Sequence, residues 1–414
     1  MSVIQVLSRL AGISLIVLAG ASSVRADTEL TLAETERLAI EHAPWLQHHQ
    51  TNATAAGERS VYESRLPDPQ LILGALNVPT DSFRLDREDM TMTMVGIRQA
   101  FPPGKTLKLR GERADKQHGR EQLMVEAEQR NLLRQVRATW LELFLAQQSL
   151  HTIEESRRFQ QRQLAAAEGR YRAAAEMPQG VLKARETLAR LEEREPMARA
   201  QIAKQQAQLS RWIGDAAYTA LPPELPALPA PPSEFDATRH PEWRAAQAMF
   251  DAAQLDVAMA REEYKPGMML DLSYGFRRPM PDGTERPDMV TAMVTFDLPV
   301  FRAKRQDRRL AEKQAMETGT RFEAEDKRRE LEAMFRTARA EYDAAQARMR
   351  IFSQTLLPAV RRQTEITVAG FARDQAEYRE ATMRRLEAEL DYLRARIDLA
   401  KAQAELLYLT GETP

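Results

Sequence analysis

Apolar and polar side chains alternate strictly along two short segments in the second half of the chain, 268–277 and 289–298. In the first segment every even position is apolar: Met268, Leu270, Leu272, Tyr274 and Phe276. A period of two residues is typical of a β-strand that has one apolar and one polar environment. The alternation therefore predicts two strands, joined by a turn in the Pro- and Gly-rich segment between them.

The first half of the chain carries a similar pair of segments, which predicts strands at 69–77 and 91–101. The proline that starts each pair, Pro69 or Pro266, recurs at an offset of 197 residues. The prolines that close the pairs have the same offset: Pro102 and Pro299. A long-period repeat determines the architecture before any single residue is considered.

Long, charged, Ala-rich stretches follow each strand pair and predict helical hairpins at 103–213 and 301–410. The last helix has the clearest heptad seam: Met383, Leu386, Leu390, Leu393, Ile397, Ala400, Ala404 and Leu407. Pro196 and Pro358 lie inside these helices and are expected to kink them. A further helix is expected before each strand pair, and Thr31 with Glu34 has the capping-box spacing at the start of the first one.

These elements divide the chain into four parts. Residues 1–26 read as a signal peptide, because an apolar run follows an early positive charge and a small-residue cleavage site follows the run. Residues 27–220 form the first structural repeat, 221–236 a Pro-rich connector, and 237–414 the second repeat. The chain has no cysteine, so neither disulfides nor lipidation on cysteine are expected.

Composition excludes several classes of protein. The net charge of −1 does not favour a nucleic-acid partner. No phosphate-binding loop, nucleophile elbow or Cys/His metal cluster is present in the sequence, so we expect no cofactor and no enzymatic activity. Charged residues make up 29% of the chain and aromatics only 6%, which is the bias of long helices and coiled coils.

Four strands with one apolar face cannot stand alone. A soluble sheet would cover that face with a helix, and no short amphipathic helix is free for it. In lipid, open strand edges are not tolerated, and the smallest transmembrane barrels have about eight strands. The consistent solution is an oligomer in which several chains each add four strands to one barrel and their helices continue it as a tube.

At this point the chain resembles the outer-membrane efflux proteins, the TolC-like channels, over essentially its whole mature length. The resemblance rests on the order and duplication of short motifs: Leu30-Thr31-Leu32-Ala33-Glu34, Leu66-Pro67-Asp68-Pro69, Phe101-Pro102, Leu298-Pro299, Leu356-Leu357-Pro358 and Gly370-Phe371. It implies a mostly α fold with a small β part. Three chains would form a 12-stranded outer-membrane β-barrel continued by a periplasmic α-helical coiled-coil tunnel.

The resemblance also implies a function and partners. The protein would be a homotrimeric exit duct of a tripartite RND-type efflux system, embedded in outer-membrane lipid with most of its mass in the periplasm. A periplasmic adaptor (membrane fusion protein) and an inner-membrane pump would be separate proteins. Segments 66–83 and 90–102 are similar to the heavy-metal branch, which implies cargo such as copper, silver, cobalt, zinc or cadmium cations. Members of that branch are often lipidated at cysteine, from which this chain departs.

Two other functions stay open. A drug-exporting or type I protein-secreting duct would have nearly the same sequence, because the pump selects the cargo. A periplasmic coiled-coil scaffold or adaptor without a pore belongs to a different class, and the alternating strands argue against it.

The helical tips are the candidate gate, because the family can close its periplasmic entrance with rings of acidic side chains. Aligned on Gly370-Phe371, Glu380 falls at such a position, while Met383 stands where a second acid would be expected. The acidic candidates at the two tips are Glu176, Asp374, Glu377 and Glu380. The competing interpretation is a solvated helix face on which Glu380 pairs with Arg384 at i+4.

Methionines near the strands are candidate metal ligands, because thioethers are soft donors suited to Cu(I). They are Met90, Met92, Met94, Met289 and Met293. By parity, Met289 and Met293 are expected on the polar face of their strand, although methionine is also an ordinary apolar filler. A second cluster, His42, His48 and His49, lacks the further ligands of a tetrahedral site and is interpreted as a surface cluster.

Overall fold

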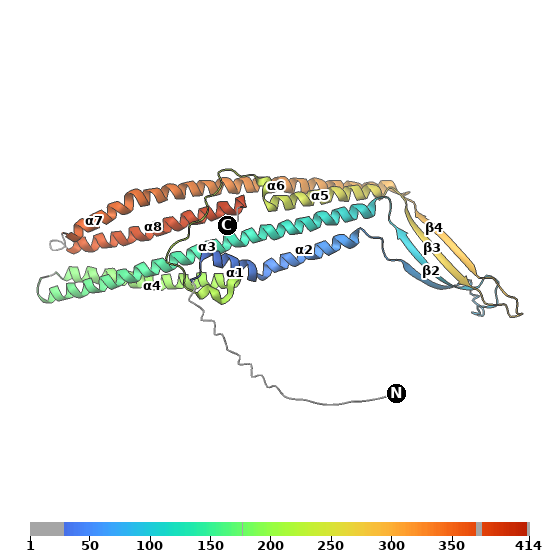
Figure 1. Ribbon diagram of the computed structural model, residues 1–414, viewed down its shortest axis with the longest axis horizontal. Coiled ribbons are helices and arrows are strands. Elements are labelled where there is room, and N and C mark those ends of the chain that lie inside the picture. Colours follow the sequence, from blue (N-terminus) through green and yellow to red (C-terminus); the bar gives the residue numbers. More distant parts are fainter. Residues whose placement is uncertain (1–28, 176, 370–374, 412–414) are drawn as a thin grey trace, which may run out of the picture.

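The computed structural model describes residues 29–175, 177–369 and 375–411. The molecule is strongly elongated, with long helices over most of its length and a small sheet at one end (Figure 1). Within the described ranges, none of the helices combines the length and the apolarity that crossing a bilayer requires.

Each half of the chain contributes helices before and after a strand pair. The first half contains α1 (Leu32–His42), α2 (Pro44–Glu63), β1 (Gln70–Leu76), β2 (Met92–Phe101), α3 (Thr106–Arg172), α4 (Pro178–Ile213) and the short η1 (Gly214–Tyr218). The second contains η2 (Ala237–Arg239), α5 (Pro241–Glu262), β3 (Gly267–Phe276), β4 (Met289–Asp297), η3 (Arg302–Lys304), α6 (Gln306–Ile351), η4 (Phe352–Leu356), α7 (Leu357–Ala369) and α8 (Gln375–Thr410).

Capping side chains and prolines mark the points where several helices begin. The Thr31 hydroxyl accepts a hydrogen bond from the Glu34 N–H at 3.2 Å, so it caps α1. The Glu34 carboxylate pairs with Arg37 at 2.6 Å. Proline occupies the first position of α2, α4 and α5, where its missing N–H costs nothing.

The two internal prolines behave differently from each other. Helix α4 runs through Pro196 without a break. The stretch expected to form one long helix kinked at Pro358 is instead divided, because the π-helical turn η4 separates α6 from α7 just before that proline. The Pro358 ring would clash with the carbonyl of Gln354 in a regular helix, and a wider turn at that point relieves the clash.

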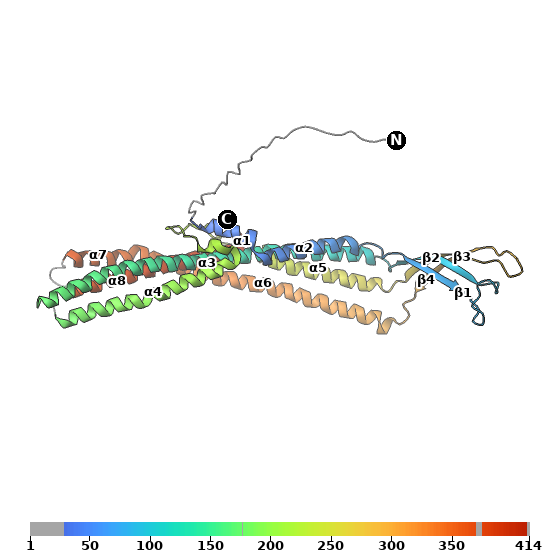
Figure 2. The same cartoon turned by 90° about the horizontal axis from the view of Figure 1, so that it is seen from below.

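The four strands form one antiparallel sheet in the order β1-β2-β3-β4. The sheet lies at the opposite end of the molecule from α7 (Figure 2). The central pair, β2 with β3, joins the two halves of the chain in register from Thr93–Phe276 to Phe101–Met268. Gly96 lies at the closest approach, because a Cβ there would sit only 2.7 Å from the Ser273 Cβ. Strands β1 and β4 are the outer members, so each has one unpaired edge.

The main core lies where α1, α3, α4, α8 and the connector meet. Trp140 is fully buried there, and its indole N–H donates to the Leu30 carbonyl at 3.1 Å. The other large buried side chains of this core are Leu46, Leu132, Val136, Leu141, Leu143, Phe144, Leu209, Trp212, Ile213 and Ile397. This core ties the middle of the long α3 to the ends of the other helices and so positions the sheet relative to the far tips.

Candidate functional site

The sheet has one continuous apolar face that the rest of the chain leaves exposed. The register places alternate residues of all four strands on this face. Leu73 is 72% exposed and Val290 is 69% exposed, values far above those of core residues. The other large exposed side chains on this face are Leu71, Ile97, Met268, Leu270, Leu272, Tyr274, Phe276, Val294 and Phe296. A patch of this extent marks contact with lipid or protein rather than water.

The opposite face of the sheet is polar and built from smaller residues. Arg98 on β2 and Asp271 on β3 lie side by side there, with Nε to Oδ1 at 2.5 Å and a second bond at 3.3 Å. The Asp271 side chain is 9% exposed. Because the pair crosses the β2–β3 junction, it also links the two halves of the chain.

Four of the five candidate methionines belong to this polar face. Met94 and Met289 occupy one row across the sheet, with Gly275 paired between them. A Cβ on Gly275 would sit 2.6 Å from the Met92 sulfur, so that thioether covers the glycine. Met293 pairs with Asp271 and shares its face. The Met92 thioether thus covers Gly275, whereas the Met94 side chain lies against Gly74 on the neighbouring strand. We call Met92, Met94 and Met289 the methionine row.

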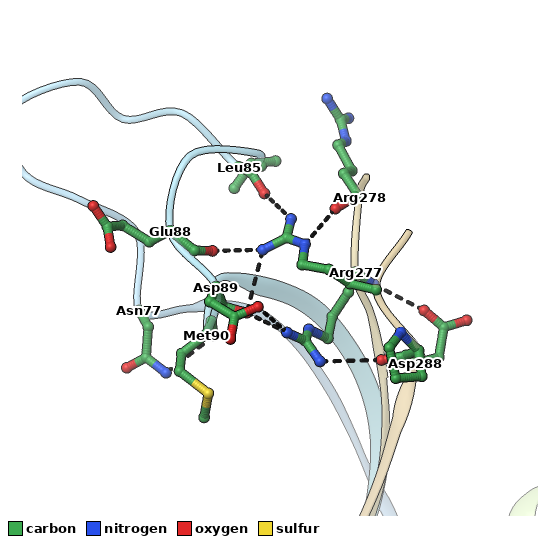
Figure 3. Close-up of polar contacts among 10 residues, drawn as sticks. Asn77, Leu85, Glu88, Asp89, Met90, Arg277, Arg278 and Asp288 are labelled. Atoms are coloured by element: carbon green, nitrogen blue, oxygen red, sulfur yellow. Dashed lines mark hydrogen bonds and ion pairs between the residues drawn. The ribbon is translucent and has the colours of Figure 1, made fainter. Parts of the chain in front are cut away.

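Met90 lies just before β2, in the loop at the end of the sheet (Figure 3). Its carbonyl accepts a hydrogen bond from the Asn77 side chain at 3.2 Å, and its side chain is 52% exposed. It therefore stands beyond the methionine row, at the end of the sheet away from the helices.

Two arginines fasten the loops 77–91 and 277–288 to each other (Figure 3). The Arg286 guanidinium donates hydrogen bonds to the backbone carbonyls of Arg278, Glu88, Asp89 and Leu85. Arg286 is only 8% exposed. Arg277 pairs with the Asp89 carboxylate at 2.7 Å. These contacts make the two loops one unit.

The same loop unit includes Asp288. Hydrogen bonds from the Arg277 backbone N–H and the Tyr274 hydroxyl lower the pKa of the Asp288 carboxyl. Sequence reasoning missed the loop arginines and the Arg98–Asp271 pair, because an arginine in a turn-prone segment carries no signal of its distant partner.

The structure describes some of the candidate gate residues at the helical tips and not others. Glu176 and Asp374 lie outside the described residues. Glu377 is in the first turn of α8 and is exposed. The Glu380 carboxylate pairs with Arg384 at 3.4 Å and its side chain is 71% exposed. This is the i+4 pair of the solvated-face interpretation.

Met383 does not extend into solvent at the tip. Its side chain packs against the buried cluster of Leu191, Leu386 and Leu390, between α4 and α8. The heptad seam of the last helix therefore includes Met383 as a packing residue.

The histidine rings on and near α2 pack edge-on against neighbouring rings and do not converge as metal ligands. The His48 and His49 rings are 5.6 Å apart, and His49 also meets Trp45 at 5.8 Å. The His42 ring is hydrogen-bonded to the Leu38 carbonyl at 3.0 Å. In the part of the chain that the structure describes, no three His, Asp or Glu side chains converge on a point where a metal could bind.

The model of one protein family, "Outer membrane efflux protein", matches residues 38–215 and 237–412, which is most of the chain. The chain belongs to the outer membrane efflux protein family. The two matched stretches correspond to the two halves described above. Members of this family are efflux channels and not enzymes, in agreement with the expectation from the sequence.

Solved structures of such channels have the same fold. CusC superposes with a TM-score of 0.76 at 14% identity, covering 93% of each chain. VceC from Vibrio cholerae gives 0.75 at 14% identity over 92% of this chain and 96% of that one. The open state of MtrE from Neisseria gonorrhoeae gives 0.72 at 16% identity over 92% and 88%. Comparison with curated proteins finds no significant match.

Proposed function

We propose that this outer membrane efflux protein works as a homotrimer, the exit duct of a tripartite RND-type system, and that it exports heavy-metal cations. The sheet is the main support for this proposal, because it has one exposed apolar face, one polar face and two unpaired edges. A sheet with open edges is not stable in lipid, so the edges must pair with other chains.

The strand directions allow such pairing. In an antiparallel sheet of four strands, β1 and β4 run in opposite directions. The β4 edge of one protomer can therefore pair antiparallel with the β1 edge of the next, and a head-to-tail contact of this kind closes into a ring. Three chains would supply the twelve strands of a barrel with the apolar face toward lipid and the methionine row toward the lumen.

The helices near the sheet have corresponding edges. Helix α2 packs on α3, α3 on α5, and α5 on α6, so α2 and α6 are the outer members there. Both carry large exposed apolar side chains: Val61 and Tyr62 on α2, and Met316 and Phe322 on α6. Burial of these side chains between protomers would extend the ring along the helical wall, which would form the periplasmic tunnel below the membrane.

The adaptor and the inner-membrane pump remain proposed partners, reached at the helical tips. Two findings support cation cargo: the methionine row on the polar face, and the similarity of segments 66–83 and 90–102 to the heavy-metal branch. Cells that lose the protein should become sensitive to copper or silver and recover tolerance when it is restored. A loss of drug tolerance instead would favour the drug-exporting alternative, and unchanged tolerance of both metals and drugs would contradict the export function.

A methionine-to-leucine exchange tests the metal contact. Changing Met92, Met94 and Met289 together to leucine keeps the volume but removes the soft ligands. We expect Ag(I) binding by the purified trimer to weaken by about tenfold, or about 1.4 kcal/mol. The matched control changes Met334 and Met349, both on α6 and away from the sheet, to leucine, which should leave silver binding intact. Equal silver affinity of the triple variant and the wild type would show that these methionines are only packing residues.

The Glu380 position tests the gate. In a trimer it would place three carboxylates around one axis, where they favour cations. Glu380→Ala should lower the ratio of cation to anion permeability in planar bilayers by about twofold or more. Glu387→Ala, on the same helix but further from the tip, serves as control. If conductance and selectivity of Glu380→Ala match the wild type, Glu380 only forms its surface pair with Arg384.

A further inference from the structure

A buried histidine joins the start of α5 to the end of α8. His240 is 1% exposed and immediately precedes α5. Its Nδ1 accepts a hydrogen bond from the Glu242 N–H at 3.3 Å, so the imidazole caps the helix. The ring also meets the edge of Tyr408 on α8, with centroids 5.5 Å apart and planes at 77°.

The cap requires the neutral ring. Nδ1 can accept a hydrogen bond only while it carries no proton, which places the neutral proton on Nε2. Nε2 is buried and has no hydrogen-bond partner in the structure. Protonation would turn Nδ1 into a donor facing the Glu242 N–H and would bury a charge. The common capping residues Ser, Thr and Asn do not titrate, so they would not respond to acid in this way.

Charged groups from all the surrounding helices face this ring. Glu242 belongs to α5 itself, Glu126 and Arg130 to α3, and Lys327 to α6. The Glu242 carboxylate accepts from the Tyr408 hydroxyl at 2.7 Å and pairs with Lys327 at 3.4 Å. Next to them, the Arg134 guanidinium of α3 lies 4.9 Å above the Tyr408 ring and pairs with Glu405 of α8 at 3.3 Å.

We propose that His240 is a proton-sensitive latch: mild acid removes the cap of α5 and releases the start of the second repeat from the end of α8. The latch couples two chain segments 166 residues apart through the Tyr408–Glu242 contact. Because α5 leads directly into β3, its release would loosen the helical wall below the sheet.

The direction of the pH effect follows from burial. Desolvation is the largest cause that lowers the pKa of His240 to about 4, with Glu242 opposing and Arg130 adding to the effect. The unfolded or opened ring has an ordinary pKa of about 6.5. The opened state therefore binds the proton more readily. Stability is fully present above about pH 6.5 and is lost progressively as the pH falls toward about 4.

Hydrogen exchange of the intact trimer tests the latch. With intrinsic rates corrected, the opening equilibrium of segments 241–247 and 404–411 should rise by about 20-fold between pH 7 and pH 5. His240→Asn keeps a capping side chain that does not titrate, so these segments should lose most of that rise. His151→Asn, at an exposed histidine of α3, should respond like the wild type.

Two outcomes would overturn the latch. One is a wild-type protein whose two segments exchange equally at both pH values, and this result does not depend on any variant folding. The other is a His240→Asn protein with the same acid response as the wild type, which would assign the response to the surrounding carboxylates.

Discussion

Glu36→Ala is expected to destabilise the protein by about 3–5 kcal/mol, because it leaves Arg137 buried without a counter-charge. The two side chains are 4% and 8% exposed, and Arg137 Nε lies 2.6 Å from Glu36 Oε1. They join α1 to α3 near Trp140, one of the tryptophans of this core. Denaturant unfolding followed by tryptophan fluorescence, to which Trp140 and Trp212 of this core contribute, should show a midpoint well below that of the wild type.

Two further variants separate burial from mere loss of charge. Glu41→Ala removes an exposed partner of Arg37 on the same helix and should change stability by less than about 1 kcal/mol. Replacing both Glu36 and Arg137 with apolar residues of similar volume should recover most of the loss, since no charge is then left buried. Equal effects of Glu36→Ala and Glu41→Ala would contradict the role of burial.

Val294→Arg is expected to cost about 2–4 kcal/mol in the membrane-inserted trimer, because it would put a charge on the lipid side near the middle of β4. Val294 pairs with Leu270 on the apolar face, whereas the next residue, Thr295, pairs with Met269 on the polar face. Thr295→Arg at almost the same depth should therefore insert nearly as well as the wild type. Folding yield into lipid vesicles measures both variants.

The opposite order of insertion yields would mean that the polar face of the sheet, and not the apolar face, is in contact with lipid. If Thr295→Arg failed to insert and Val294→Arg inserted, the methionine row would face lipid and could not contact exported ions. Insertion of both variants would argue that the sheet does not enter a bilayer.

Sequence reasoning worked wherever the signal is local. Alternation over ten residues is enough to identify β3, since each side chain reports on its own face. Parity alone placed Met289 and Met293 on the polar face, and the observed register agrees. The heptad seam predicted the packing side of α8, in which Leu390, Ile397 and Leu407 are buried.

The sequence pattern did not predict contacts between residues that are far apart in the chain, nor local adjustments of helix geometry. The proline rule predicted a kink at Pro358, but not that the preceding turn would widen into η4. His240 looks like any residue before a proline in the sequence. Its role depends on Tyr408, which lies 168 residues further along the chain.

The amino-acid sequence by itself determined the repeat, the element types and the family, because periodicity and turn chemistry act over a few residues. Only the tertiary structure decided which charges are buried together, such as Arg137 with Glu36, and which methionine covers Gly275. Those pairings depend on strand register and helix packing, in which segments more than 100 residues apart meet. The free energy of such contacts comes from burial and mutual geometry, which no short stretch of sequence contains.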